Sequence, residues 1–483
     1  MLLEATCSMN GTKTPGGRAL VRWCLVTFCL TILLAAASFG GTNKFLATLE
    51  VLIGLAAFLL LFWAVAKAND WTKRKDFFAP TVAFPLGYIL WFVIGSVDFI
   101  HVPSSVSLGL FEPIPTYIWF YIAAGLAAYF LGVRLIRPSQ DPQGLKTNCR
   151  DVWCRRRFWQ IIVALSVVMI VSYSYIISQM GIPALSQFAG EARLGMANHG
   201  VMQAVLFSSA WTIILFLLTF VWAYPHTRAV GMVCWAGVIV ASVLLLSLGG
   251  RGQLFVPFLT AFVLRHYIKA RFRLAKLVSV LILGFCLTSA FGYLRDTALV
   301  GDNEAGEWFN IPAPLLSVIY AYLYIRYPVA TFRDLTTVIP KSVGFQYGTL
   351  TFGPLDTLLP GHHQQSDMFF KQVLGNDFIG AGQPATLLGP LYADGGMLGI
   401  VTGMFLFGMT MAAAYRWMLT EPTLFRKLIY AWVIQTGIFS YFSDLFPYIM
   451  TLWMPLMWLG LSRILPAQKY GESTQPATTQ VAL

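Results

Sequence analysis

Hydrophobic residues in this chain lie in long uninterrupted runs that are separated by short polar segments. A transmembrane helix needs about 17–25 mostly apolar residues to cross the ~30 Å hydrocarbon core of a bilayer, and the runs have this length. A transmembrane β-barrel would instead show alternation in ten-residue units, so the runs predict helices. Twelve spans are expected: a run ending at Phe39, then Phe45–Ala66, Pro80–Asp98, Pro115–Leu135, Trp159–Ile177, Val201–Tyr224, Val230–Leu248, Gln253–Tyr267, Leu274–Ala290, Met397–Tyr415, Leu428–Phe446 and Ile449–Leu465.

One long segment, residues 291–396, is left over by these spans and is expected to form a large loop. It divides the chain into nine spans in residues 1–290 and three spans in residues 397–465, followed by a polar tail, 466–483. The expected fold class is therefore an all-α polytopic membrane protein with about 12 transmembrane helices.

Within this loop, the stretch Ala313–Ile325 is apolar but short, because Arg326 and Pro328 follow it directly. A further span here would also place basic residues of the last helices on the wrong side of the membrane. We therefore expect an interfacial or re-entrant helix in the loop.

The distribution of charge gives the orientation. The chain is 57% hydrophobic and 11% charged, which is too apolar for a soluble globular protein. Its net charge of +12 would suit a nucleic-acid partner, but 25 of the 33 basic residues fall in alternate loops on one side. This bias is typical of cytoplasmic loops, so both termini are expected in the cytoplasm and no nucleic-acid binding is expected. The large loop, with five basic and nine acidic residues, then faces outward.

Seven cysteines give no framework of disulfides, because none lies in an expected outer loop. The sequence also contains no HExxH, no DxD and no paired cysteine motif. We expect no metal site and no cofactor.

Four arginines lie near the outer face on separate segments: Arg193 in GIPALSQFAGEARLGM, Arg251 in SLGGRGQLF, Arg295 in FGYLRD and Arg326 in YAYLYIRYP. Arginine binds phosphate oxygens through two parallel hydrogen bonds and stays charged, so the four are candidates for binding an anionic head group. The alternative is that each one anchors to lipid head groups or pairs with a nearby acid.

Aromatic and titratable residues of the large loop supply further candidates. Tyr320, Tyr324 and Tyr327 surround Arg326 and could stack on sugar rings, or could belong to an interfacial aromatic belt. His362 is a candidate base, although a histidine in such a loop is often only solvated. Asp394, in GPLYADGGMLGI, could accept a proton from a sugar hydroxyl or could cap the helix expected to begin near Met397.

Taken together, these segments resemble the bacterial Wzy-type O-antigen polymerases, which are oligosaccharide repeat-unit polymerases. The resemblance runs from Gly181 to Gly408, through the arginine segments quoted above, then FQYGTLTFGPLDTLLPG and PATLLGPLYADGGMLGIVTGMFLFG. It implies a GT-C-like, metal-independent glycosyltransferase of the inner membrane that joins undecaprenyl-diphosphate-linked repeat units at the periplasmic face. It also implies a chain-length regulator protein as a partner.

By the same resemblance, Arg193, Arg251, Arg295 and, less closely, Arg326 are expected to be working residues. The chemistry of a diphosphate leaving group favours these arginines for binding the diphosphate, and it favours Asp394 or His362 as the base for the acceptor hydroxyl. Two other functions stay open at this point. An O-antigen ligase would share the topology and the donor but transfer the glycan to lipid A-core. A polysaccharide flippase or other transporter would need charged residues in the middle of its spans, and such residues are scarce here.

Overall fold

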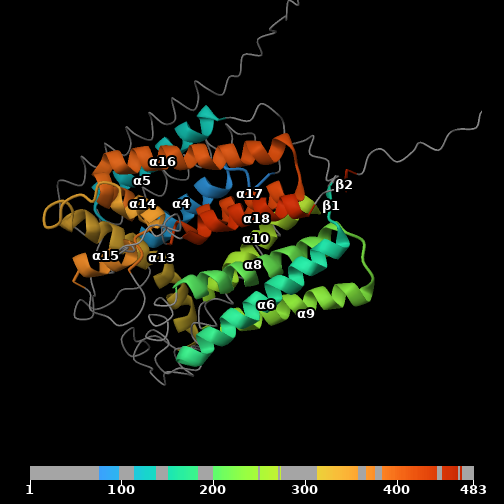
Figure 1. The fold of residues 1–483 in the computed structure, drawn as a ribbon. Helices are drawn as coiled ribbons and strands as arrows, with labels where there is room; N and C mark the ends of the chain where they lie inside the picture. Colours follow the sequence, from blue (N-terminus) through green and yellow to red (C-terminus); the bar gives the residue numbers. More distant parts are fainter. Residues whose placement is uncertain are drawn as a thin grey trace, which may run out of the picture. The chain divides into compact units, whose positions relative to one another are not determined.

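The computed structural model describes residues 76–96, 114–136, 151–182, 200–248, 251–269, 272, 313–356, 366–375, 383–442, 449–465 and 468–469. Helices account for nearly all of the regular structure in these ranges (Figure 1). They are α4 (Ala83–Ser96), α5 (Thr116–Leu135), α6 (Arg155–Met180), α8 (Gly200–Ala223), α9 (Arg228–Ser247), α10 (Arg251–Ile268), α13 (Ala313–Val338), α14 (Thr349–Asp356), α15 (Ser366–Val373), α16 (Leu388–Thr420), α17 (Leu424–Phe439) and α18 (Ile449–Ile464).

The strands of the described part are two residues long each. β1 (Asp151–Val152) precedes α6 and pairs antiparallel with β2 (Gln468–Lys469), which follows α18. This short ladder ties the start of α6 to the end of α18.

Helices occupy nine of the twelve expected spans, and the other three fall outside the described residues. Five of these helices are long and apolar enough to cross a membrane: α5, α6, α8, α9 and α16. The protein is thus a helical polytopic membrane protein, whereas the total of twelve spans stays a prediction.

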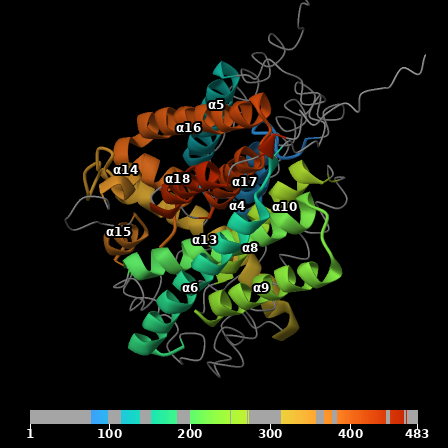
Figure 2. The same cartoon turned by 45° about the vertical axis from the view of Figure 1, so that its right-hand side comes forward.

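Among the described helices, the most extensive contact joins α5 to α16, and α5 passes behind α16 in both views (Figures 1 and 2). Glycines make this contact possible. A Cβ atom on Gly132 of α5 would clash with the carbonyl oxygen of Phe405, and one on Gly408 of α16 would clash with that of Tyr129. The two backbones therefore touch directly, as is typical where small residues line a helix interface in a membrane.

A second group of helices, α6, α8 and α9, also packs side by side (Figure 2). α8 is largely buried, whereas α6 and α9 expose apolar side chains such as Val163, Val171 and Val240. Apolar faces of this kind suit contact with lipid chains rather than water.

One expectation about the large loop was wrong. The helix expected to stop at Ile325 continues through Pro328 to Val338 as α13. A proline inside a helix costs about 3 kcal/mol, but Val329, Phe332 and Leu335 are all fully buried, and this packing outweighs the cost. α16 starts at Leu388, but its backbone is broken at Gly395 and Gly396, so the helix expected from Met397 is its second half.

Candidate functional site

The break in α16 is the centre of the candidate site. Gly396 has a φ of +59°, a conformation that only glycine adopts without strain, and Gly395 is also non-helical. α16 is therefore two helices in one: a short first half, Leu388–Asp394, and the apolar second half that was expected as a span. The break separates the end of the large loop from this span.

Asp394 joins the break to a neighbouring helix. Its carboxylate accepts hydrogen bonds from the backbone N–H groups of Leu350, at 3.2 Å, and Thr351, at 2.7 Å. These are first-turn amides of α14, which have no partner within their own helix. Asp394 is only 7% exposed, and both of its oxygens are engaged. It caps α14, and not the helix that follows it in sequence.

The turn before α14 is fastened to the same place. The N–H of Gln346 donates to the carbonyl oxygen of Ala393 at 2.9 Å, and that of Tyr347 donates to the carbonyl oxygen of Asp394 at 3.1 Å. The ring of Phe345 lies over Gly396, where a Cβ atom would come within 3.1 Å of it. Residues 345–351 thus wrap around the break in α16.

Aromatic residues from three helices meet next to this turn. The rings of Tyr121 (α5) and Tyr392 (α16) lie 5.3 Å apart, and Phe332 of α13 contacts both of them. The hydroxyl of Tyr392 donates to the carbonyl oxygen of Ile339 at 3.2 Å. Tyr392 is two residues from Asp394, so this cluster joins α5, α13 and α16 beside the break.

The two arginines of α13 already have partners within the protein. Arg326 is 0% exposed, and its Nη1 donates to the carbonyl oxygen of Gly95 at 2.5 Å, at the C-terminal end of α4. Arg333 is buried and pairs with Asp334 at 2.7 Å. Arg326 therefore joins α13 to α4, and a direct contact with a diphosphate stays a prediction.

Tyr327, a candidate for sugar stacking, lies on α13 and is half-buried. Burial, and after it the negative charge of Asp334, raises the pKa of Tyr327 to about 12. Its hydroxyl is neutral at physiological pH and can donate a hydrogen bond.

The remaining sequence candidates are only partly described. Arg193, Arg295 and His362 lie outside the described residues, and so do the side chains of Tyr320 and Tyr324, whose backbones belong to α13. Arg251 is the first residue of α10. The helix start next to it is held in place by the indole N–H of Trp211, which donates to the carbonyl oxygen of Gln253 at 2.7 Å.

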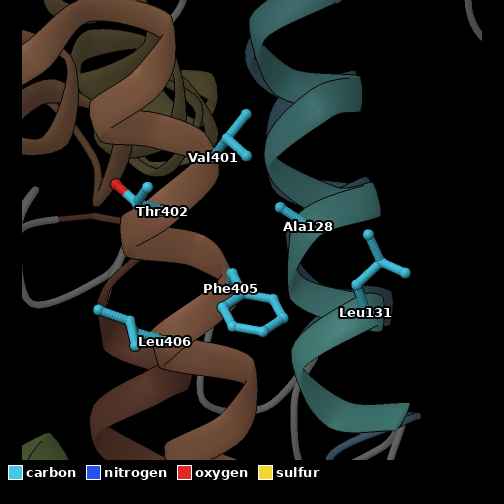
Figure 3. A pocket seen from close by; sticks show the side chains of 6 residues that line it. All are labelled: Ala128, Leu131, Val401, Thr402, Phe405 and Leu406. Carbon is cyan, nitrogen blue, oxygen red and sulfur yellow. The ribbon is translucent and has the colours of Figure 1, made fainter. Parts of the chain in front are cut away.

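An apolar groove runs between α5 and α16 (Figure 3). It has a volume of about 360 Å³ and is lined by Ala128, Leu131, Val401, Thr402, Phe405 and Leu406. The hydroxyl of Thr402 donates to the carbonyl oxygen of Leu398 at 2.7 Å, so it adds no free polar group to the lining. Val401 lies five residues after Gly396, so the groove begins about 8 Å along the helix axis from the break.

A second polar cluster, which the sequence did not reveal, lies before α4. Asp76 is buried and accepts hydrogen bonds from the hydroxyls of Tyr267, at 2.9 Å, and Tyr415, at 2.7 Å, while His266 lies 3.5 Å away. Burial by itself would raise the pKa of Asp76, but His266 and the two tyrosines outweigh it and hold the pKa below its ordinary value of 3.8. The cluster ties the entry to α4 to the ends of α10 and α16.

In the sequence, the cluster is marked only by Asp76, an acidic residue that follows basic residues and directly precedes an apolar run. Asp76 follows Lys73, Arg74 and Lys75, so it reads as part of a solvated loop. Its partners are nearly 200 residues or more away in the chain, and no local pattern connects them.

Comparison with known proteins gives one match. The model of a family described as "Putative O-antigen polymerase" matches residues 24–440, which is most of the chain. None of the curated proteins and none of the solved structures matches the chain.

Proposed function

Because this chain belongs to the O-antigen polymerase family, we propose that it joins undecaprenyl-diphosphate-linked oligosaccharide repeat units into a surface polysaccharide. The observation that carries the proposal is the family match over residues 24–440 of a helical membrane protein. We place the reaction at the periplasmic face of the inner membrane, with both termini in the cytoplasm. This placement rests on the concentration of basic residues on one side of the expected spans.

In the proposed reaction, a hydroxyl oxygen of the acceptor unit attacks the anomeric carbon of the donor. The bond from that carbon to the diphosphate breaks, the diphosphate leaves with the bonding electrons, and the hydroxyl proton passes to a base on the enzyme. The donor is already activated, so the protein needs to neutralise the departing diphosphate and to orient the acceptor. Neither step requires a metal or a cofactor.

We assign diphosphate binding to Arg193, Arg251 and Arg295. The position of Arg251 supports this role, because it begins α10 and the first-turn amides of a helix favour an anion. Arg326 is proposed to act on the diphosphate only through its charge and without direct contact, since its guanidinium donates to the carbonyl oxygen of Gly95.

For the acceptor hydroxyl we assign His362 as the base and Asp394 as a positioning residue. Both carboxylate oxygens of Asp394 hold the first turn of α14, and this geometry supports a structural role beside the reacting groups. Tyr327, with Tyr320 and Tyr324 on the same helix, is proposed to contact sugar rings.

The groove between α5 and α16 is proposed to hold the polyprenyl chain of the substrate. The groove has an apolar lining and lies between two helices that are long and apolar enough to span the membrane. The end of the groove at Val401 lies about 8 Å along the helix axis from the break in α16. A lipid chain in the groove would bring its diphosphate toward the level of the break.

Reconstitution of the purified protein in liposomes tests the proposal. With lipid-diphosphate-linked repeat units as the only substrate, we expect a ladder of products that differ by one unit. Transfer only to added lipid A-core would show a ligase, and movement of intact substrate across the bilayer without bond formation would show a transporter.

Arg251→Ala should reduce polymer formation strongly, and Arg251→Lys should restore part of it, because a lysine keeps the charge but not the paired hydrogen bonds. Arg416→Ala, at an exposed arginine at the opposite end of α16 from the break, is the matched control and should leave the ladder unchanged. A full ladder from Arg251→Ala at normal protein level would refute the assignment of Arg251.

A further inference from the structure

Tyr347 has an unusual backbone conformation. Its φ is +50°, in the left-handed region that bulky residues rarely adopt, and the next residue, Gly348, has a φ of +92°. A glycine or asparagine would occupy this position with less strain. Strained positions of this kind persist where the surroundings enforce them and often accompany function.

Burial of the Tyr347 side chain does not compensate for this backbone strain. It is 87% exposed, and Phe352, on the first turns of α14, is 58% exposed. The ring of Phe352 lies against Gly348, where a Cβ atom would come within 3.2 Å of it. Tyr347 thus lies in the turn that leads into α14, and Phe352 lies in the first turn of that helix.

This turn is held firmly. Its backbone is bonded to Ala393 and Asp394, and the Asp394 carboxylate caps the helix that carries Phe352. The protein thus maintains a strained turn that exposes Tyr347, directly before a helix that exposes Phe352.

Tyr347 and Phe352 lie on other elements than the remaining exposed apolar side chains. Among the described residues, the other exposed large apolar side chains lie on α5, α6, α8, α9, α10, α16 or α18, or directly after α6. Tyr347 and Phe352 lie instead in the expected outer loop, near the side chains of Gln346 and the exposed Thr349. Gln346 donates to the carbonyl oxygen of Gly344 and Thr349 to that of Gln346, and the side-chain oxygens of both residues can still accept hydrogen bonds.

We propose that Tyr347 and Phe352 form a platform on which a pyranose ring of the oligosaccharide stacks, next to the break in α16. Aromatic faces suit the C–H surface of a sugar ring, and the neighbouring polar groups suit its hydroxyls. The proposal rests on the proposed function, and it adds a glycan contact that the sequence candidates Tyr320, Tyr324 and Tyr327 did not include.

The test is binding of the lipid-free repeat-unit oligosaccharide to the purified full-length protein in detergent, measured by calorimetry. Tyr347→Asn removes the ring and tolerates the left-handed conformation, so its melting temperature should equal or exceed that of the unaltered protein. Its affinity should fall by about two- to tenfold, the range expected for the loss of one aromatic contact. Phe352→Ala should have a similar effect, and Tyr347→Phe should bind normally.

Trp235→Ala, at an exposed aromatic residue on α9, is the matched control and should bind like the unaltered protein. Unchanged affinity in both Tyr347→Asn and Phe352→Ala would overturn the platform. So would a defect confined to insertion into bilayers, since that would show an interfacial anchor.

Failure of the platform and failure of the proposed function give different results. If the unaltered protein polymerises in liposomes but Tyr347→Asn binds the oligosaccharide normally, only the platform is wrong. If the oligosaccharide binds in a Tyr347-dependent manner but no polymer forms, the platform stands and the proposed function is wrong.

Discussion

Replacement of Asp394 tests which of two roles this residue has: positioning of the turn before α14, or removal of the proton from the acceptor hydroxyl. In the structure, both carboxylate oxygens accept backbone N–H groups of α14, at 3.2 and 2.7 Å. Alanine removes both acceptors. Asparagine is nearly the same size and keeps one acceptor oxygen, but its NH₂ group cannot accept the second bond.

The size of the effect follows from these two bonds. Loss of a helix cap costs about 0.5–2 kcal/mol, and a hydrogen bond to a charged acceptor contributes about 1.5–3 kcal/mol. The opened turn regains bonds to water, so we take about 2 kcal/mol for Asp394→Ala and about 1 kcal/mol for Asp394→Asn. These values correspond to about thirtyfold and fivefold increases in the population of the open turn.

Hydrogen exchange at the amides of Leu350 and Thr351 measures this opening directly. Exchange should be about thirtyfold faster in Asp394→Ala and about fivefold faster in Asp394→Asn, and the rate of polymer formation should fall in the same order. Glu421→Ala is the control, because Glu421 is 66% exposed and its ion pair with Arg426 lies at the other end of α16. If both Asp394 variants lost all activity while exchange at these amides stayed normal, Asp394 would act on the substrate and the positioning role would be wrong.

Three further predictions concern other parts of the fold. Gly408→Leu should push α16 away from Tyr129 and greatly lower the yield of monodisperse protein in size-exclusion chromatography, whereas a normal profile would contradict direct backbone contact. Asp76→Asn should lower the melting temperature at neutral pH. Because the pKa of Asp76 is depressed in the folded state, the difference in melting temperature from the unaltered protein should persist above pH 4 and shrink below it. A difference in melting temperature that did not change with pH would contradict this prediction. Thr402→Trp, at an exposed residue of the groove lining, should fill the groove and raise the KM for the lipid-linked substrate without loss of stability. Val240→Trp, at an exposed residue of α9, should leave the KM unchanged, and equal KM values for the two variants would exclude the groove as the site of the lipid chain.

The spans were predictable because the membrane imposes a simple rule on the sequence. A buried backbone in lipid must form helices, so a run of apolar residues suffices to locate one. This is why α5, α6, α8 and α9 lie close to where their runs predicted them. The same rule says nothing of short helices outside the membrane, so it did not predict the short first half of α16, Leu388–Asp394, before the break at Gly395 and Gly396.

The loop was less predictable because tertiary contacts decide its structure. Pro328 is a local signal for a helix end, but the burial of its neighbours against α4 overrides it. The role of Asp394 depends on amides more than forty residues away in sequence, and Arg326 of α13 donates to the carbonyl oxygen of Gly95 on α4. Sequence identified Asp394 and Arg326 as unusual residues, but only the fold shows what they contact.

The central claim, that this protein polymerises repeat units, is tested most directly in its host. The gene is deleted and the surface lipopolysaccharide is separated on a gel, with the intact gene returned on a plasmid as the control. We predict that the ladder of long chains disappears while lipid capped with a single repeat unit remains, and that the plasmid restores the ladder. An unchanged ladder, or the loss of all O-antigen including the single unit, would contradict the claim.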